Sequence, residues 1–246
     1  MGRIVAIGGM SKDMESINQI NSQIISLSGI TNPRLLYMPT ANKDHEWYSN
    51  YIKDYFENNF GCKVNVMKLI TEELKQETIR EQILSSDIIF VEGGNSFLLL
   101  DTWGKYNVDV YLKEAYDKNI LLSGISAGAI CWFNYGHSSS LKYSNPDNWE
   151  FTLIKGLSFI DAFVCPHFNE TGREESFTNI LKNSMTEGTV GIGIDNDCAL
   201  AILDKEFKVI SENDGAMFHK FWKSNDEILR RDFMGNVSLP ANIIIN

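Results

Sequence analysis

The chain has 246 residues, of which 43% are hydrophobic and 22% are charged, and its formal net charge is −10. A chain of this length can bury a full hydrophobic core, so we expect one globular domain over residues 1–246. The acidic balance repels phosphate backbones and anionic lipid, which argues against nucleic acid and membrane surfaces as partners.

The first half of the chain alternates short apolar runs with helix-length segments. The segments 13–27 and 45–60 carry apolar or aromatic residues at three- and four-residue spacing, as amphipathic helices do. Strand, helix and strand in repetition predict an α/β fold with a doubly wound, mostly parallel sheet that helices cover on both faces. The predicted strands are Ile4–Ile7, Leu35–Met38, Val64–Met67, Ile88–Val91 and Ile120–Leu122.

The second half is less regular. The stretch from His137 to Trp149 is rich in Ser, Asn and Tyr and predicts a loop or a hairpin. A helix is expected over Glu174–Ser184, and late strands are expected over Val190–Ile194, Ala199–Leu203 and Phe207–Ile210.

Neither a signal peptide nor a membrane span is expected, because no apolar run is long enough for either. The four cysteines lie far apart without a Cys-x-x-Cys pair, which favours reduced thiols and a cytoplasmic location. Nothing in the sequence indicates a metal or an organic cofactor. The cysteines are Cys62, Cys131, Cys165 and Cys198.

A candidate nucleophile follows the fifth predicted strand, in Gly124-Ile125-Ser126-Ala127-Gly128. This is a G-x-S-x-G motif between a buried strand and a helix-like segment, which is the context that a nucleophilic serine requires. Glycines two residues before and after Ser126 let neighbouring backbone pass closely. The start of the following helix directs free N–H groups toward a developing oxyanion. The alternative is a glycine-rich turn with an incidental serine.

A second glycine-rich turn, Glu92-Gly93-Gly94-Asn95-Ser96, follows the predicted strand Ile88–Val91. Ligands of open α/β sheets bind beyond the carboxyl ends of the strands, so this turn and Ser126 are expected to lie at one edge. Backbone amides here, together with the N–H of Ala127, are expected to form an oxyanion hole. The alternative is a simple turn in which Asn95 caps the next helix.

A serine nucleophile needs a general base, and the sequence offers four histidines. His167 directly follows an apolar run in Cys165-Pro166-His167-Phe168, which places it at a probable strand end. His45 opens a surface helix, His137 lies in the polar stretch, and His219 lies near a late strand. These three are interpreted as structural or solvated.

Three motifs in register carry a family resemblance. They are Val91-Glu92-Gly93-Gly94-Asn95-Ser96, Gly124-Ile125-Ser126-Ala127-Gly128-Ala129 and Pro166-His167-Phe168. In this order and spacing, the chain resembles the dipeptidase E (aspartyl dipeptidase) family of serine peptidases, with which cyanophycinases are grouped. The similarity extends roughly from Arg3 to Leu203.

The resemblance implies a flavodoxin-like fold shared with class I glutamine amidotransferases, and the hydrolysis of short peptides. It implies Ser126 as nucleophile, His167 as base, and Gly94 and Ala127 as oxyanion donors. Aspartyl dipeptidases cleave dipeptides with an N-terminal Asp, whose side chain is held by an arginine shortly after Pro-His-Phe. Arg173 occupies the matching position here, and a guanidinium can bind a carboxylate in bidentate fashion. The alternative is a solvated arginine at a helix start. Asn95 is a further candidate for substrate contact.

The third catalytic group is where the sequence departs from the family pattern. In Gly193-Ile194-Asp195-Asn196-Asp197, Asn196 stands where the family commonly has Glu. Asp195, Asp197 and Asp147 all remain candidates, as does a neutral orienting group, which lowers activity without abolishing it. This departure leaves specificity for N-terminal Asp open.

Other functions are also compatible with the sequence. An α/β-hydrolase esterase orders its triad Ser, acid, His, and Ser126, Asp195 and His219 satisfy that order, although the chain lacks an HGGG-type segment. A glutamine amidotransferase needs a cysteine at position 126. A non-catalytic binding homologue is the third alternative. The expected assembly is a monomer or a homodimer.

Overall fold

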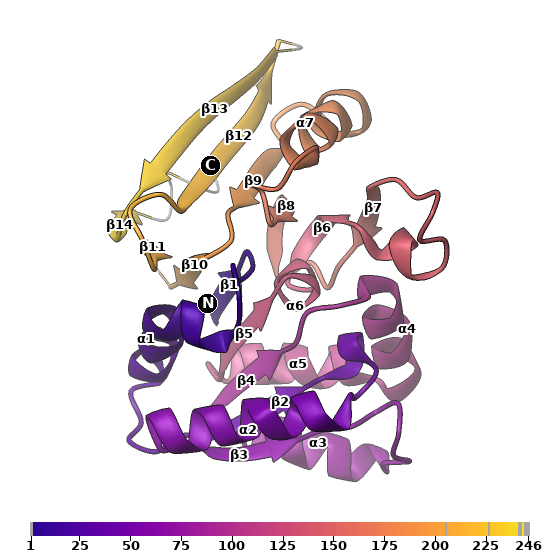
Figure 1. The fold of residues 1–246 in the computed structure, drawn as a ribbon, viewed down its shortest axis with the longest axis vertical. Helices are drawn as coiled ribbons and strands as arrows, with labels where there is room; N and C mark the ends of the chain where they lie inside the picture. Colours follow the sequence, from indigo (N-terminus) through magenta and orange to yellow (C-terminus); the bar gives the residue numbers. More distant parts are fainter. Residues whose placement is uncertain (1, 205, 226, 241–242, 244–246) are drawn as a thin grey trace.

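The computed structural model describes residues 2–204, 206–225, 227–240 and 243, which form two β-sheets and the helices around them (Figure 1). The first sheet has eight strands in the order β14-β11-β10-β1-β5-β4-β2-β3. Its strands β1 to β5 are mutually parallel. They are β1 (Arg3–Ile7), β2 (Arg34–Met38), β3 (Lys63–Val66), β4 (Ile88–Val91) and β5 (Leu121–Ile125).

Helices pack on both faces of this parallel block. Alternate residues of one strand enter different cores, as the two-residue period of a strand requires: Leu35 and Tyr37 face one core, while Leu36 and Met38 face the other. The predicted α/β class is confirmed. One face is covered by α1 (Asn18–Ser28) and α2 (Glu46–Phe60), the other by α3 (Gln76–Leu84), α4 (Ser96–Tyr106) and α5 (Val108–Asp117).

The first sheet continues beyond β1 through antiparallel strands. These are β10 (Cys198–Leu203), β11 (Glu206–Ser211) and β14 (Val237–Pro240). They include two of the predicted late strands, with ends that differ by at most one residue.

The second sheet was not predicted as a separate sheet, although one of its strands, β9, is the predicted late strand Val190–Ile194. Its six strands have the order β13-β12-β9-β8-β6-β7, with a parallel centre of β6, β8 and β9. The β12–β13 hairpin extends away from the parallel block of the first sheet (Figure 1). The strands are β6 (Phe133–Ser138), β7 (Thr152–Lys155), β8 (Ile160–Pro166), β9 (Val190–Ile194), β12 (Met217–Ser224) and β13 (Glu227–Met234).

Of the loop and the hairpin predicted for the stretch from His137 to Trp149, the structure shows the hairpin, with β6 and β7 as antiparallel neighbours joined by residues 139–151. His137 and Ser138 belong to β6, which pairs with β7. The His137 ring is fully buried and stacks on Phe151 at 4.6 Å, so tertiary packing overrides the polar local sequence. Residues after Ser138 do leave the sheet and form the 3-10 helix η3 (Ser140–Tyr143).

Backbone contacts join the two sheets beside β1. Gly9 forms a parallel bridge with Asn196, and the N–H of His167 donates to the Gly8 carbonyl at 3.1 Å. The carboxyl ends of β1, β4 and β5 in one sheet therefore meet those of β8 and β9 in the other.

Two general properties accompany this fold. In the part of the chain that the structure describes, no helix is both long and apolar enough to cross a bilayer. The four cysteines are all buried and free.

Candidate active site

Ser126 occupies a strained turn between β5 and the short helix α6 (Ala127–Ile130). Its backbone has φ 56° and ψ −111°, a conformation that costs a non-glycine residue roughly 1–3 kcal/mol. The Ser126 N–H donates to the carbonyl of Ile7 at 3.0 Å, which fixes the turn to the end of β1.

The two glycines of the motif are required by close backbone packing. A Cβ atom at Gly124 would lie 2.2 Å from the carbonyl oxygen of Gly128, and one at Gly128 would lie 2.2 Å from that of Val91. No side chain fits at either position, so the turn can stay tight against β4 and keep Ser126 at the edge of the sheet.

His167 reaches Ser126 from the second sheet. It directly follows β8, as predicted, and has φ 53°, so it is also a strained non-glycine residue. Its Nε2 lies 2.8 Å from Ser126 Oγ. The structure thus brings together the two residues that the sequence analysis selected as nucleophile and base.

The other nitrogen of His167 faces an amide. Asn196, two residues after β9, places its Oδ1 2.6 Å from His167 Nδ1. The Asn196 N–H in turn donates to Asn169 Oδ1 at 3.0 Å. Gly9 packs against the pair: a Cβ atom there would lie 2.0 Å from Asn196 Oδ1 and 2.3 Å from His167 Nδ1. In the sequence, Asn196 stands where the family commonly has Glu, and its place just after a predicted strand is the one signal that it lies at the site.

None of the three aspartates considered as third catalytic group contacts His167. Asp195 accepts from the Met217 N–H at 3.0 Å and lies 3.1 Å from His219 Nε2. Asp197 accepts from the N–H of Ser11 at 2.8 Å. Asp147 is exposed in the turn after η3. In this structure Asp195 and Asp197 are bonded to other groups and Asp147 lies in solvent, whereas Asn196 holds the position beside His167 Nδ1.

The histidines other than His167 contact groups away from Ser126. His219 is 2% exposed and lies between the carboxylates of Asp195 and Asp232, so it does not serve Ser126 as the esterase alternative requires. His45 caps α2 by accepting from the Tyr48 N–H.

His137 is buried beside Ser176. Its Nε2 lies 2.9 Å from Ser176 Oγ, and burial lowers its pKa to about 3.

The glycine turn after β4 presents one backbone donor. Gly93 N–H is used internally, since it donates to Glu92 Oε1 at 2.9 Å. Among the described residues, the N–H groups of Gly94 and Ala127 donate to no acceptor. Gly94 has φ 140°, and a Cβ atom there would lie 2.3 Å from the Ala41 carbonyl oxygen, so this position requires glycine.

Glu92 is a buried carboxyl group beneath this turn. It accepts from the Tyr37 hydroxyl at 2.7 Å as well as from Gly93, and burial raises its pKa. Its two acceptor contacts hold the turn from below and leave Gly94 facing the site.

Of the two residues predicted to contact substrate, Asn95 and Arg173, only Arg173 lines the cavity at Ser126. Asn95 is used as a helix cap, since its Oδ1 accepts from the N–H groups of Phe97 and Leu98, and it does not line the cavity at Ser126. Arg173, the first residue of α7 (Arg173–Ser184), does line it.

Arg173 is almost completely buried beside the cavity. Its guanidinium lies over the Phe151 ring, 4.7 Å from the centroid, and its Nε is 3.5 Å from Glu170 Oε2. That Nε has no hydrogen-bond partner among the described residues. A buried guanidinium with an unused donor is suited to an anionic ligand.

The groups around His167 change the pKa of its imidazole. Burial lowers the pKa of His167, the Glu170 carboxylate and the Asn196 contact raise it, and the cations Arg173 and Lys142 lower it. A base whose pKa lies below its ordinary value stays neutral, and therefore able to accept a proton, down to lower pH.

Ser126 opens into a cavity of about 370 Å³. Its wall includes His167, Arg173 and, from the segment around η3, Ser139, Lys142 and Tyr143. This volume suits a small ligand and not a folded chain.

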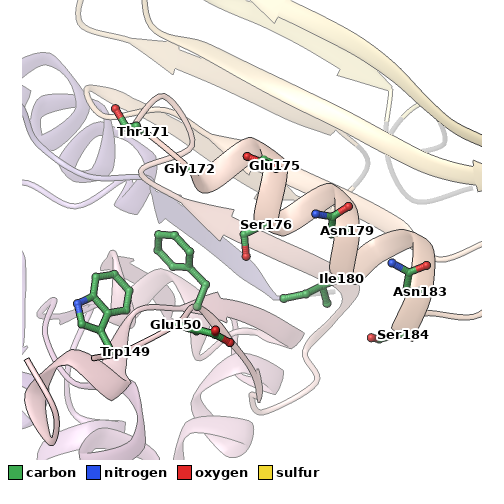
Figure 2. Close-up of a pocket in the computed structure, with 11 residues that line it drawn as sticks. Trp149, Glu150, Thr171, Gly172, Glu175, Ser176, Asn179, Ile180, Asn183 and Ser184 are labelled. Carbon is green, nitrogen blue, oxygen red and sulfur yellow. The ribbon is translucent and has the colours of Figure 1, made fainter. Parts of the chain in front are cut away.

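A larger cavity of about 850 Å³ lies between α7 and residues 149–151 (Figure 2). Ser126 and His167 do not line it. Phe151 lines this larger cavity, and its ring contacts the guanidinium of Arg173, which lines the cavity at Ser126. Size alone would therefore select the wrong cavity for the chemistry.

Bacterial proteins described as uncharacterised peptidases are similar to this chain in sequence. A Bacillus subtilis protein described as the uncharacterised peptidase YgaJ is 29% identical and covers 93% of this chain and 95% of its own length. The Pasteurella multocida uncharacterised peptidase PM1590 is 26% identical and covers 75% of this chain and 87% of its own length.

Solved structures match over nearly the whole fold. A peptidase from an acI-B1 actinobacterium superposes with a TM-score of 0.73 at 18% identity, covering 98% of this chain and 97% of that one. A Listeria monocytogenes protein assigned to peptidase E gives a TM-score of 0.60 at 19% identity, covering 95% and 99%. The model of peptidase family S51 matches residues 4–210. The chain belongs to peptidase family S51 and is a peptidase.

Proposed function

We propose that this peptidase is a serine hydrolase of short peptides, with Ser126 as nucleophile and His167 as general base. The observation that carries the proposal is the 2.8 Å contact between Ser126 Oγ and His167 Nε2 on a strained strand-to-helix turn. A hydroxyl so placed can lose its proton to the imidazole as it attacks, which is the requirement for nucleophilic catalysis by serine.

The reaction is acyl transfer. His167 Nε2 takes the Ser126 proton while Oγ bonds to the scissile carbonyl carbon, and the oxyanion is held by the N–H groups of Gly94 and Ala127. The imidazolium then gives its proton to the leaving amine as the C–N bond breaks. Water, deprotonated by His167, attacks the acyl-enzyme and releases the acid.

The preferred substrate is a dipeptide with an N-terminal acidic residue. Supporting this preference are the buried guanidinium of Arg173 at the cavity wall, with its unused Nε donor, and the small volume of the cavity. The segment around η3 closes the cavity on one side, which favours short peptides over folded proteins. Intact casein cleaved as fast as a dipeptide would contradict this part of the proposal.

A dipeptide panel tests the proposal. Asp-Xaa, Glu-Xaa and neutral-Xaa dipeptides are assayed with wild type, Ser126→Ala and Arg173→Ala. Ser126→Ala should lose about 10⁴-fold or more in kcat on every substrate. Arg173→Ala should lose about 100-fold in kcat/KM on acidic substrates only, because a charge-assisted hydrogen bond is removed.

A fluorophosphonate probe separates an active enzyme from a binding homologue. Wild type should be labelled covalently, and Ser126→Ala should not. An unlabelled, folded wild-type protein would favour the non-catalytic alternative.

A further inference from the structure

Glu170 stands between the two functional groups of the site. Its Oε1 lies 3.4 Å from His167 Nδ1 and 3.5 Å from Asn196 Nδ2, and its Oε2 lies 3.5 Å from Arg173 Nε. One carboxylate therefore faces the base, the group that orients the base, and the candidate substrate-binding cation.

The contacts fix the roles of the ring nitrogens. If Nε2 of His167 accepts the Ser126 proton, Nδ1 carries hydrogen and donates to Asn196 Oδ1 at 2.6 Å. The orientation of the Asn196 amide agrees, because its Nδ2 faces Glu170 Oε1, a group that can only accept. Asn196 thus orients the His167 ring but places no negative charge beside it.

A neutral amide does not stabilise the imidazolium that forms during acyl transfer as a carboxylate does. Within the described cavity wall, Arg173 and Lys142 both disfavour that cation, and Glu170 is the anion at its Nδ1 side. The two carboxylates next to Asn196 in the chain have other partners: Asp195 Oδ1 lies 3.1 Å from His219 Nε2, and Asp197 Oδ1 accepts from the Ser11 N–H at 2.8 Å.

Building on the proposed function, we propose that the work of one catalytic carboxylate is divided in this chain, with Asn196 orienting His167 and Glu170 supplying the negative charge that stabilises its protonated form. The second oxygen of Glu170 lies 3.5 Å from Arg173 Nε, within ion-pair distance but without a hydrogen bond. Glu170 is a positioning residue, since it acts through His167.

The expected size of the effect follows from exposure. The Glu170 side chain is 48% exposed, so water screens its interaction with His167, and the effect is far smaller than that of a buried triad acid. Glu170→Gln is expected to lower kcat about two- to fivefold, the range of exposed ion pairs, and a fivefold change corresponds to a change of about 0.7 in the pKa of His167.

The sign of the pH effect is definite. A carboxylate next to an imidazole favours the protonated form, so removing its charge lowers the pKa of His167. The acidic limb of kcat/KM in Glu170→Gln should therefore move to lower pH, while KM for Asp-Xaa does not rise, because Arg173 stays in place. A merely structural role would not give this combination.

The test uses three variants of the full chain. Glu170→Gln is compared with Glu174→Gln, a matched change four residues on, where the carboxylate pairs with Arg230 at 2.6 Å instead of facing His167. Asn196→Asp in the Glu170→Gln background should restore charge at Nδ1, moving the limb back toward wild type. NMR titration of the His167 ring, one of only four histidines, reads the same shift without substrate.

Failure of this inference differs from failure of the proposed function. If Ser126→Ala keeps full turnover, the proposed function is wrong. If Ser126→Ala is inactive but Glu170→Gln matches Glu174→Gln in both the acidic limb and the His167 titration, the division of roles alone is overturned.

Discussion

Two histidines of this protein have opposite surroundings. His167 faces a hydroxyl on one side and an amide on the other, and its side chain is 20% exposed at a cavity. His219 has a carboxylate at each ring nitrogen, those of Asp195 and Asp232, and is buried.

The difference arises from two consecutive residues. Asp195 and Asn196 follow β9, and extended backbone sends neighbouring side chains to opposite sides. The aspartate therefore reaches His219, and the asparagine reaches His167. An Asp–His pair, which looks like part of a triad in the sequence, is here a structural element without a nucleophile. Catalytic assignment must start from the serine and not from the acid.

The largest effect that tests this comparison is on turnover. His167→Ala should reduce kcat by about 10⁴-fold and prevent fluorophosphonate labelling, because Ser126 loses its base. His219→Gln should keep labelling and remain within a few-fold of wild type per folded molecule. The measurement is kcat with the folded fraction determined by circular dichroism.

The opposite result would favour the esterase alternative. A folded His219→Gln protein that is not labelled, together with a labelled His167→Ala protein, would assign the base to His219.

The next effect is on stability. His219→Ala leaves the buried Oδ1 of Asp195 without its imidazole partner, and an unsatisfied buried polar group costs about 1–3 kcal/mol of unfolding free energy. The double variant Asp195→Asn/His219→Ala should cost less than the sum of the single changes, since both changes remove the same hydrogen bond. Urea denaturation measures all three. If the losses of unfolding free energy in the two single variants add up to the loss in the double variant, Asp195 and His219 do not stabilise each other.

Much of the first sheet and one strand of the second could be predicted from the sequence. Ile88–Val91 and Val190–Ile194 are identical in prediction and structure, because strands buried on both faces read as continuous apolar runs. The β12–β13 hairpin carries polar residues such as Lys220 and Arg231 along its length, and so it gave no clear apolar run.

The candidate site was predictable where the motif itself demands a backbone shape. Ser126 and His167 each follow a strand end, and their contact was expected. The partner of His167 was not, because the choice between Asp195, Asn196 and Asp197 depends on how the chain leaves β9 and joins Gly9 in the other sheet. The strand end indicates the region, but a tertiary contact decides which of the three side chains reaches His167.

A third histidine extends the comparison to acid stability. His137 is buried among aromatic rings, and burial lowers its pKa from 6.5 to about 3. The folded state thus holds this ring neutral between pH 6.5 and 3, whereas the unfolded chain protonates it. Stability that is present above pH 6.5 is therefore lost as the pH falls toward 3, by up to about 1.4 kcal/mol per pH unit.

His137→Gln should be less stable than wild type at pH 7, but its unfolding free energy should fall less steeply between pH 6.5 and 3. Ser176→Ala is the matched control: it removes the hydroxyl 2.9 Å from His137 Nε2 and keeps the titrating ring. It should lower stability by a similar amount at every pH and leave the slope unchanged. Urea denaturation at several pH values measures both quantities. Equal slopes in wild type and His137→Gln would mean that His137 is protonated in the folded protein, and the contrast between its apolar surroundings and the acid-paired His219 would then disappear.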